Sequence, residues 1–420
     1  MSGRVDVVIV GGGTAGITVA SRLLRKAKAV DLHISIVEPA AVHYYQPALT
    51  LVGAGVTRLD NIQRPEAKLI PGKAEWDKTE VIGYFPEENN VKLKSGEKLS
   101  YDYLVVCPGL KLDWDKIPGA RETLGRNGVS SNYSPDHAID TWDNIQYLKP
   151  GATAIFTQPP LPFKCPGAPQ KAAYLAADYL RKKGILKSCK VYFMAHAPVI
   201  FAVPLFAREL EKIASGYGIT VNYQHNLIGV DGDNKKATFE IVGGSDQGKQ
   251  YTIQYDMLHI TPPQSPPDSL KQSSLANAAG YIDVDQATLQ HKKYPNIFGL
   301  GDAASTPNSK TAAAVRKQAP VVVDKLLAMI RGEQSVAVYD GYASCPLTTA
   351  YHKVIMAEFC YGGKVTPSFP LDPRKPRWIY WIIKTTGLPI FYWYYMLKGF
   401  KKFPPHNTGY VEPANPEKPA

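Results

Sequence analysis

Residues 5–16 read Val-Asp-Val-Val-Ile-Val-Gly-Gly-Gly-Thr-Ala-Gly, a short β-branched run that leads directly into a glycine-rich turn. An apolar run of this length predicts a strand buried on both faces, as in the interior of a parallel sheet. Gly11, Gly13 and Gly16 follow the GxGxxG spacing. In that motif the first glycine makes a tight turn, the second lets a pyrophosphate approach the backbone, and the third lets helix and strand pack closely.

The residues after this turn complete a nucleotide-binding unit. Residues 17–26 predict a helix, and its first residue, Ile17, is a candidate cofactor-binding residue. Residues 33–37 predict a second strand that ends at Glu38. The helix N-terminus attracts phosphate oxygens, and an acid in this place accepts hydrogen bonds from a ribose diol. The sequence therefore predicts a dinucleotide site, and Glu38 disfavours a ribose 2′-phosphate. This motif alone does not distinguish FAD from NAD.

Two later segments favour FAD. Residues 101–109, Tyr-Asp-Tyr-Leu-Val-Val-Cys-Pro-Gly, predict a strand that ends in a small-residue turn at Gly109. Residues 294–302, Tyr-Pro-Asn-Ile-Phe-Gly-Leu-Gly-Asp, predict another strand, which ends at Gly301 and Asp302. In this order the three segments resemble the FAD fingerprints of the two-dinucleotide-domain flavoprotein reductases. The resemblance implies that Asp302 lies near the ribityl chain and that a helix from about Thr311 faces the flavin.

The middle of the chain lacks the second glycine motif with which reductases of that superfamily bind NAD(P)H. After a strand expected at residues 152–156, residues 157–169 read Thr-Gln-Pro-Pro-Leu-Pro-Phe-Lys-Cys-Pro-Gly-Ala-Pro. The prolines remove backbone N–H groups that a phosphate cradle needs. The next strand, expected at residues 190–194, is followed by Ala-His-Ala-Pro and has no acid for a ribose. We therefore expect a second lobe of nucleotide-binding shape that binds no nucleotide, with Cys165 in the place of the nicotinamide.

Composition and charge exclude several classes of protein. The chain has 420 residues, of which 45% are hydrophobic and 20% charged, as in a globular protein of two or three domains. The mean hydropathy of −0.20 excludes a polytopic membrane protein. The net charge is +11, but eight of the basic residues lie between positions 364 and 403, beside one acid. Because a nucleic-acid binder spreads its basic residues over a folded face, no nucleic-acid partner is expected.

Five cysteines are present, namely Cys107, Cys165, Cys189, Cys345 and Cys360. Their number and spacing fit neither a secreted disulfide scaffold nor a zinc site, so no metal is expected. A donor that reduces a flavin through thiols needs two sulfurs that can exchange through a mixed disulfide. Cys165 and Cys345 both precede a proline, in segments expected to be irregular, whereas Cys360 follows an expected apolar helical stretch. The residues alone leave Cys345 and Cys360 as competing partners.

Several longer segments resemble sulfide:quinone oxidoreductase, in its mitochondrial-type branch, and the resemblance extends over nearly the whole chain. They are residues 163–171, Phe-Lys-Cys-Pro-Gly-Ala-Pro-Gln-Lys; 261–267, Thr-Pro-Pro-Gln-Ser-Pro-Pro; 309–314, Ser-Lys-Thr-Ala-Ala-Ala; and 339–347, Tyr-Asp-Gly-Tyr-Ala-Ser-Cys-Pro-Leu. The resemblance implies that Cys165 and Cys345 are the redox pair. It also implies flavin contacts by Gln46 and Lys310 and an adenine contact by the backbone of Val81.

The activity that this resemblance implies is oxidation of hydrogen sulfide. Hydrosulfide attacks the disulfide, Cys345 keeps the sulfane sulfur as a persulfide, and Cys165 leaves as a thiolate that reduces FAD, which passes electrons to ubiquinone. A small acceptor (glutathione, sulfite or cyanide) then removes the sulfur. Bacterial relatives carry a third essential cysteine, and residues 125–133 have none, so noncovalent FAD is expected. Lys164 and Lys171 would favour the anion and the thiolate, unless they are solvated surface residues.

The segment Trp378–Met396 is rich in aromatic residues and holds half of the tryptophans of the chain. A membrane span needs about 20 continuous apolar residues, whereas Lys384, Gly387 and Pro389 interrupt this one. We expect two short helical pieces that form a hairpin in one leaflet, with residues 374–403 on the membrane surface, in preference to a span or a buried core helix. The tail beyond Pro404 is expected to be loose.

The sequence thus predicts an α/β protein with two Rossmann-like lobes. We expect an FAD lobe at residues 1–110 and 281–335, a degenerate lobe at 111–280, and a redox-cysteine and membrane-anchoring region at 336–420. The alternatives are a type-II NADH:quinone oxidoreductase and a non-catalytic redox-signalling flavoprotein. The resemblance implies a monotopic protein of the mitochondrial inner membrane, although no transit peptide is visible. A homodimer is also considered.

Overall fold

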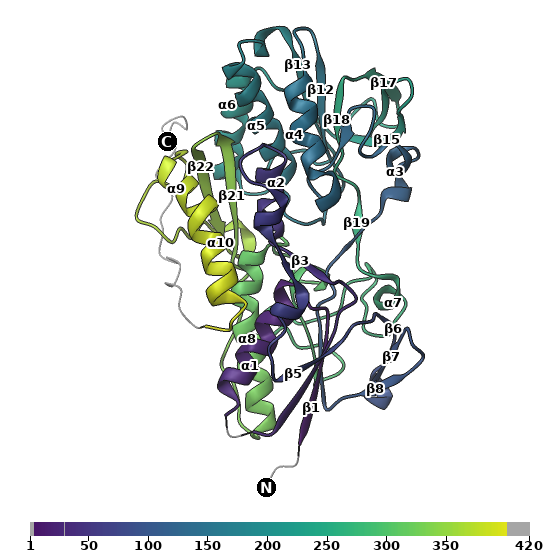
Figure 1. The fold of residues 1–420 in the computed structure, drawn as a ribbon, viewed down its shortest axis with the longest axis vertical. Coiled ribbons are helices and arrows are strands. Elements are labelled where there is room, and N and C mark those ends of the chain that lie inside the picture. Colours follow the sequence, from purple (N-terminus) through teal and green to yellow (C-terminus); the bar gives the residue numbers. More distant parts are fainter. Residues whose placement is uncertain (1–3, 29, 401–420) are drawn as a thin grey trace.

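The computed structural model describes residues 4–28 and 30–400. Two five-stranded parallel sheets, one in each half of the elongated molecule, form its frame (Figure 1). The first sheet has the strand order β20 (Ile297–Gly299), β9 (Tyr103–Val106), β1 (Val5–Val10), β2 (Leu32–Val37) and β5 (Ala74–Asp77). The second has the order β11 (Val129–Ser130), β18 (Met257–His259), β12 (Thr153–Gln158), β13 (Lys190–Ala195) and β14 (Thr220–Tyr223).

Smaller antiparallel sheets and hairpins decorate this frame. They are β6 (Val81–Phe85), β7 (Asn90–Leu93) and β8 (Lys98–Ser100); β15 (His225–Asp231), β16 (Lys236–Ile241) and β17 (Gln250–Gln254); β3 (Val42–Tyr44) with β4 (Gln63–Pro65); β10 (Lys111–Leu112) with β19 (Gln264–Ser265); and β21 (Ala343–Ala350) with β22 (Lys353–Phe359). Strand β19 lies between the halves of the molecule in Figure 1, where it pairs with β10.

Helices pack around the two sheets. They are α1 (Thr14–Lys26), α2 (Leu49–Val52), α3 (Ala120–Thr123), α4 (Ala138–Tyr147), α5 (Ala168–Lys182), α6 (Pro204–Tyr217), α7 (Asp268–Lys271), α8 (Ala312–Ile330), α9 (Trp378–Ile382) and α10 (Leu388–Phe391). Helix α1 begins at Thr14, three residues before the predicted start. The predicted α/β fold with two nucleotide-binding-type lobes is confirmed.

The parallel arrangement brings distant motifs to one edge of the first sheet. Strands β1, β2, β9 and β20 run in the same direction, so their carboxyl ends meet. Gly11, Glu38, Gly109 and Asp302 follow these ends within three residues. Ligands of open α/β sheets bind outside the carboxyl ends of the strands, so this edge is where the predicted cofactor residues can act together.

The C-terminal segment differs from its prediction. It forms one helical rod, in which π-helical turns at Ile383–Gly387 and Tyr392–Met396 alternate with α9 and α10. The predicted hairpin was wrong because Gly387 keeps helical dihedral angles (φ −63°, ψ −50°). The widened turn before Pro389 accommodates the proline ring, which would otherwise meet the carbonyl of Thr385. Among the described residues, no helix is both long and apolar enough to cross a bilayer.

Candidate functional site

Cys165 and Cys345 lie side by side although 180 residues separate them. Their Sγ atoms are 3.4 Å apart, a distance that suits a reduced thiol pair about to form a disulfide. Cys165 lies in the irregular loop between β12 and α5, as predicted. Cys345 lies within strand β21, so the prediction of an irregular segment there was wrong. Pro346 is tolerated because, in the part of the chain that the structure describes, this hairpin has two strands and the other edge of β21 pairs with no strand.

The loop before α5 holds Cys165 in an unusual conformation. Its φ is +47°, a left-handed value that non-glycine residues adopt at a cost of about 1–3 kcal/mol. Hydrogen bonds fix this conformation: the Cys165 N–H donates to the carbonyl of Lys310 (2.9 Å), and its carbonyl accepts from the N–H of Ala168 (2.8 Å). The Tyr133 hydroxyl, from the segment after β11, contacts the carbonyls of Lys164 and Cys165 at 2.9 and 3.2 Å.

Gly167 allows the two sulfurs to meet. A Cβ atom at this position would lie 2.6 Å from the Sγ of Cys345 and 2.5 Å from a methyl carbon of Leu347. Any side chain would therefore push β21 away from the loop. Because Gly167 immediately precedes α5, Cys165 also lies near the N-terminus of a 15-residue helix, which favours an anion.

Lys171, one turn into α5, supplies a positive charge to the pair. Its ammonium donates to the Sγ of Cys165 at 3.3 Å, and the residue is only 3% exposed, so it is not a solvated surface lysine. A hydrogen bond from Cys345 and the charge of Lys171 hold the pKa of Cys165 well below its usual value, although burial opposes this. The same hydrogen bond and burial raise the pKa of Cys345. Cys165 is therefore the thiolate of the pair.

A second buried lysine near the sulfurs comes from the C-terminal helix. Lys384 is 3% exposed, and burial together with repulsion by Lys171 lowers its pKa to about 7, while Cys165 and Cys345 oppose the shift. In the sequence Lys384 only interrupts a membrane-type segment, and its position beside the sulfurs was not predicted. The one sequence signal for the burial of Lys384 is its spacing of one helical turn from Trp381, which lies on the buried face of the helix.

A group of opposite charges lies next to the Cys165 loop. Burial raises the pKa of the Asp302 carboxyl, while the charges of Lys164 and Lys310 oppose this shift. Burial lowers the pKa of Lys164, and lowers that of Lys310 to about 8. The Lys310 ammonium donates to the carbonyls of Ala304 and Thr306, and its backbone carbonyl holds Cys165. The structure thus places Asp302, from the third predicted FAD segment, close to the loop that holds Cys165.

The glycine turn after β1 has the geometry of a dinucleotide cradle. A Cβ at Gly11 (φ +104°) would lie 2.4 Å from the carbonyl oxygen of Cys107, and one at Gly16 would lie 1.9 Å from that of Gly11. At Gly13 nothing lies within 4 Å of the added atom, so this side of the turn is open. These three environments match the three roles of the motif, and the open one suits a pyrophosphate. The residues present therefore fit FAD.

Glu38 is held against the same turn. Its carboxylate accepts hydrogen bonds from the N–H groups of Gly12 and Ala40, both at 2.8 Å, and burial raises its pKa. Ile17 is fully buried, and its N–H donates to the Gly13 carbonyl, so it contributes through the position of α1 rather than as a phosphate donor.

Among the described residues, no contact defines a role for three further predicted residues. Gln46 is exposed in the turn before α2, and Val81 is buried at the first position of β6, where it pairs with Leu93. Gly109 has a φ of +75° and an open environment beyond β9. The structure does not bring Gln46 or Val81 into contact with the cysteine pair through any described hydrogen bond.

The other cysteines lie apart from the pair. Cys107 is buried at the first-sheet edge, with burial raising its pKa, and Cys189 contacts the carbonyl of Lys149. Cys360 pairs with the hydroxyl of Thr366 at 3.5 Å, and burial raises its pKa to about 11. It follows strand β22, so the helical stretch predicted before it was wrong: these apolar residues pair with β21 in a hairpin, and all of them after Lys353 are buried.

Comparison with known proteins identifies the family. A family model for pyridine nucleotide-disulphide oxidoreductases matches residues 5–142. Over 394 residues the chain is 46% identical to the mitochondrial sulfide:quinone oxidoreductase of Dictyostelium discoideum, covering 94% of this chain and 86% of that protein. The chain belongs to the sulfide:quinone oxidoreductase family.

Two further members support this assignment. The mitochondrial sulfide:quinone oxidoreductase of Mus musculus is 42% identical over 395 residues, covering 94% of this chain and 87% of that protein. The solved structure of the sulfide:quinone oxidoreductase from Aquifex aeolicus matches with a TM-score of 0.78 at 22% identity, over 94% of this chain and 92% of that one. At this identity the structural match shows that the fold is shared. The family assigned from the sequence motifs is confirmed.

Proposed function

We propose that this protein oxidises hydrogen sulfide through the Cys165–Cys345 pair and delivers the electrons through FAD to ubiquinone. The observation that carries the proposal is the 3.4 Å separation of the two sulfurs, with the buried ammonium of Lys171 3.3 Å from Cys165. The proline-containing loop that presents Cys165 follows β12, where a nicotinamide-binding protein carries its glycine turn. Sulfide is thus the donor better suited to this site than NADH.

The charges around the pair assign a role to each sulfur. In the oxidised pair, hydrosulfide attacks the Sγ of Cys345, a new S–S bond forms there, and the Cys165–Cys345 bond breaks. Cys165 accepts the electron pair and leaves as a thiolate, which suits its lowered pKa and the adjacent charge of Lys171. The persulfide proton can leave to solvent or to a nearby lysine such as Lys384 when that lysine is neutral. Cys345 keeps the sulfane sulfur.

An acceptor then restores the pair. A nucleophile of the class of glutathione, sulfite or cyanide attacks the outer sulfur of the Cys345 persulfide and takes it away, which leaves a Cys345 thiolate beside Cys165. Loss of two electrons from these two thiolates reforms the disulfide. When bound, FAD supplies the chemistry of this oxidation, because it can accept two electrons and release them to a quinone. The residues that would hold it are those of the glycine turn with Glu38 and Asp302.

The surface of the C-terminal helix supports the membrane part of the proposal. Its outer face exposes large apolar and aromatic side chains, namely Trp378, Ile379, Ile382, Ile390, Tyr394, Tyr395 and Phe400. Exposed Lys375 and Lys398 lie near its two ends, where each cation gains about 1 kcal/mol at an anionic lipid surface. We propose that this rod lies in the interface of the mitochondrial inner membrane, as a monotopic anchor. Residues 401–403 of the proposed anchor and the tail beyond Pro404 lie outside the described residues.

Further parts of the proposal rest on the sequence. The FAD is held noncovalently, because residues 125–133 contain no cysteine. The FAD lobe corresponds to residues 1–110 and 281–335, the degenerate lobe to 111–280, and the redox and anchoring region to 336–420. We also propose that the protein forms a homodimer. Light scattering of the protein in detergent would measure its oligomeric state.

An anaerobic titration of the purified flavoprotein tests the function. Addition of sulfide should bleach the flavin absorbance, and a short-chain quinone should restore it. Addition of NADH should leave the absorbance unchanged, because the loop after β12 lacks a phosphate cradle. Bleaching by NADH but not by sulfide would overturn the proposal and favour a type-II NADH:quinone oxidoreductase. No bleaching by either donor would favour a non-catalytic flavoprotein.

A further inference from the structure

The C-terminal helix reaches the glycine turn through one tyrosine hydroxyl. The Oη of Tyr392 lies 2.7 Å from the Oγ1 of Thr14 and 2.6 Å from the Nε2 of His43. The Nδ1 of His43 lies 3.2 Å from a carboxylate oxygen of Glu66. Tyr392, His43 and Glu66 are 2%, 5% and 1% exposed, so water does not compete for the two contacts of His43. A chain of four polar groups, three of them buried and Thr14 half-buried, thus joins segments that are more than 300 residues apart.

The chemistry of these groups gives the chain a direction. In the tautomer that carries its proton on Nδ1, His43 donates to the Glu66 carboxylate, and its Nε2 is an acceptor. The Tyr392 hydroxyl therefore donates to His43 and accepts from the hydroxyl of Thr14. With this direction, removing the tyrosine oxygen leaves the Thr14 hydroxyl without its acceptor and the buried Nε2 of His43 without its donor.

Both ends of this chain lie at the dinucleotide cradle. Thr14 is the first residue of α1, between Gly13 and Gly16, where the backbone N–H groups of a helix lack partners within the helix. At the other end, a Cβ added to Gly12 would lie 2.8 Å from the Oε1 of Glu66, an atom for which no hydrogen-bond partner is found among the described residues. The Tyr392 hydroxyl therefore connects Thr14, at the start of α1, with the His43–Glu66 pair on the other side of the glycine turn.

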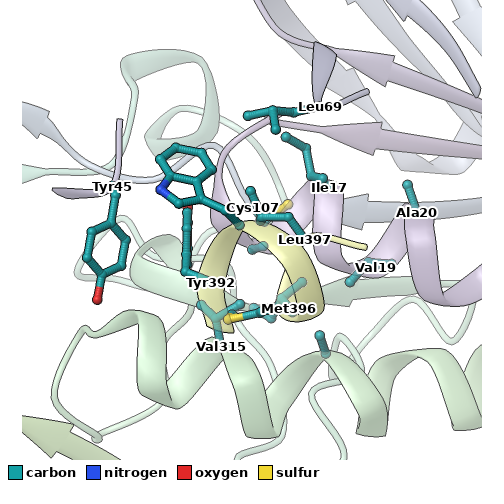
Figure 2. Close-up of a cluster of buried hydrophobic side chains, with 14 of the residues drawn as sticks. Ile17, Val19, Ala20, Tyr45, Leu69, Cys107, Val315, Tyr392, Met396 and Leu397 are labelled. Carbon is teal, nitrogen blue, oxygen red and sulfur yellow. The ribbon is translucent and has the colours of Figure 1, made fainter. Parts of the chain in front are cut away.

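The rest of the C-terminal rod is fixed along the same helix. Met396 and Leu397 pack with Ile17 and Ala20 of α1 in the buried cluster drawn in Figure 2. The hydroxyl of Ser21 donates to the carbonyl of Leu397 at 2.7 Å. At the end of the rod, Arg22 donates to the carbonyl of Phe400 and Arg25 to that of Lys398. The proposed membrane-binding rod is thus packed on the helix that begins the cofactor cradle.

We propose that Tyr392 is a positioning residue for FAD, through which the C-terminal rod clamps the cofactor cradle. It holds Thr14 and His43 in the arrangement that receives the pyrophosphate. The coupling is reciprocal by linkage: FAD binding favours a docked rod, and a docked rod favours bound FAD. The inference rests on the proposed function only in taking FAD as the ligand.

The test compares two hydroxyl deletions on the same rod. Tyr392→Phe removes the clamping oxygen and keeps the ring, whereas Tyr395→Phe removes a hydroxyl from a tyrosine that is 49% exposed. Apoprotein of the full chain is prepared for each variant, and FAD affinity is measured by quenching of flavin fluorescence. Loss of this paired hydroxyl should weaken FAD binding about tenfold in Tyr392→Phe, and change it less than about twofold in Tyr395→Phe.

Limited trypsin digestion supplies a readout that does not depend on activity. In the wild-type protein, FAD should slow cleavage at Arg377 and Lys398, at the two ends of the rod. In Tyr392→Phe this protection by FAD should be reduced about tenfold, in proportion to the lost coupling. A residue that only stabilises the fold would lower the unfolding temperature of the apoprotein without changing either FAD affinity or protection by FAD.

A second variant tests the contact from its other side. Thr14→Val removes the partner hydroxyl, and the double variant should bind FAD no more weakly than the weaker single variant, because both changes break one contact. Equal FAD affinity in wild type and Tyr392→Phe, or fully additive losses in the double variant, would overturn the inference. If the wild-type protein binds no FAD, the proposed function fails, a result distinct from failure of the clamp.

Discussion

Replacing Lys171 by methionine tests the assignment of Cys165 as the thiolate of the pair. The substitution keeps most of the length of the buried side chain and removes its charge. In the structure the ammonium lies 3.3 Å from the Sγ of Cys165; Lys171 is buried, whereas Cys165 is half-buried. Without this cation, burial raises the pKa of Cys165 with less opposition, so less thiolate is present at any pH below that pKa.

The size of the effect follows from the contact. A hydrogen bond to a charged group contributes about 1.5–3 kcal/mol. Since about 1.4 kcal/mol corresponds to a factor of ten, the thiolate population should fall roughly 10- to 150-fold under conditions in which the thiol form predominates. Loss of the buried charge also removes its repulsion of Lys384, which opposes part of this change. We therefore expect an effect nearer the lower limit.

The assay is the rate of alkylation of the reduced protein by iodoacetamide, with the modified Cys165 peptide quantified by mass spectrometry. Lys182→Met is the matched control, because Lys182 lies in the same helix with half of its side chain exposed and pairs with Asp178 instead of a sulfur. Alkylation should slow at least about tenfold in Lys171→Met and stay unchanged in the control. An unchanged rate in Lys171→Met would refute the role of this lysine.

Three other predictions follow from the same structure. Cys345→Ser should abolish bleaching of the flavin by sulfide, whereas Cys360→Ser should retain it, and equal loss in both would refute the assigned pair. Because burial lowers the pKa of Lys384 to about 7, its protonation opposes folding below that pH, and this cost fades as the pH rises toward the usual lysine value. Lys384→Met should therefore raise the unfolding temperature more at about pH 6 than at about pH 9, and a gain independent of pH would contradict this. Gly13→Ala should weaken FAD binding but change the stability of the apoprotein by less than about 1 kcal/mol, since no described atom lies within 4 Å of the added Cβ. Gly16→Ala, in contrast, should destabilise the apoprotein itself. Unchanged FAD affinity in Gly13→Ala would exclude this turn as the pyrophosphate site.

Local patterns predicted the strands and turns of the first sheet because their information is local. The β-branched run before Gly11 and the acid at the end of β2 each depend on a few neighbouring residues and on one strand direction. The same reasoning failed for Cys345, which precedes Pro346 inside a strand that has one partner strand among the described residues. It also failed for the C-terminal rod, because tertiary contacts along α1 stabilise helical turns that proline and glycine disfavour by propensity.

The sequence by itself determined the fold class, the family, the glycine cradle and the absence of a second glycine motif, since each of these is written in contiguous residues. Only the tertiary structure decided which groups surround the sulfurs. Lys171 and Lys384 have ordinary sequence neighbours, yet the packing of α5 and of the C-terminal rod buries both beside Cys165 and Cys345. Their pKa values, and the contact of Tyr392 with Thr14, depend on burial and on distances between segments far apart in the chain, which no local pattern specifies.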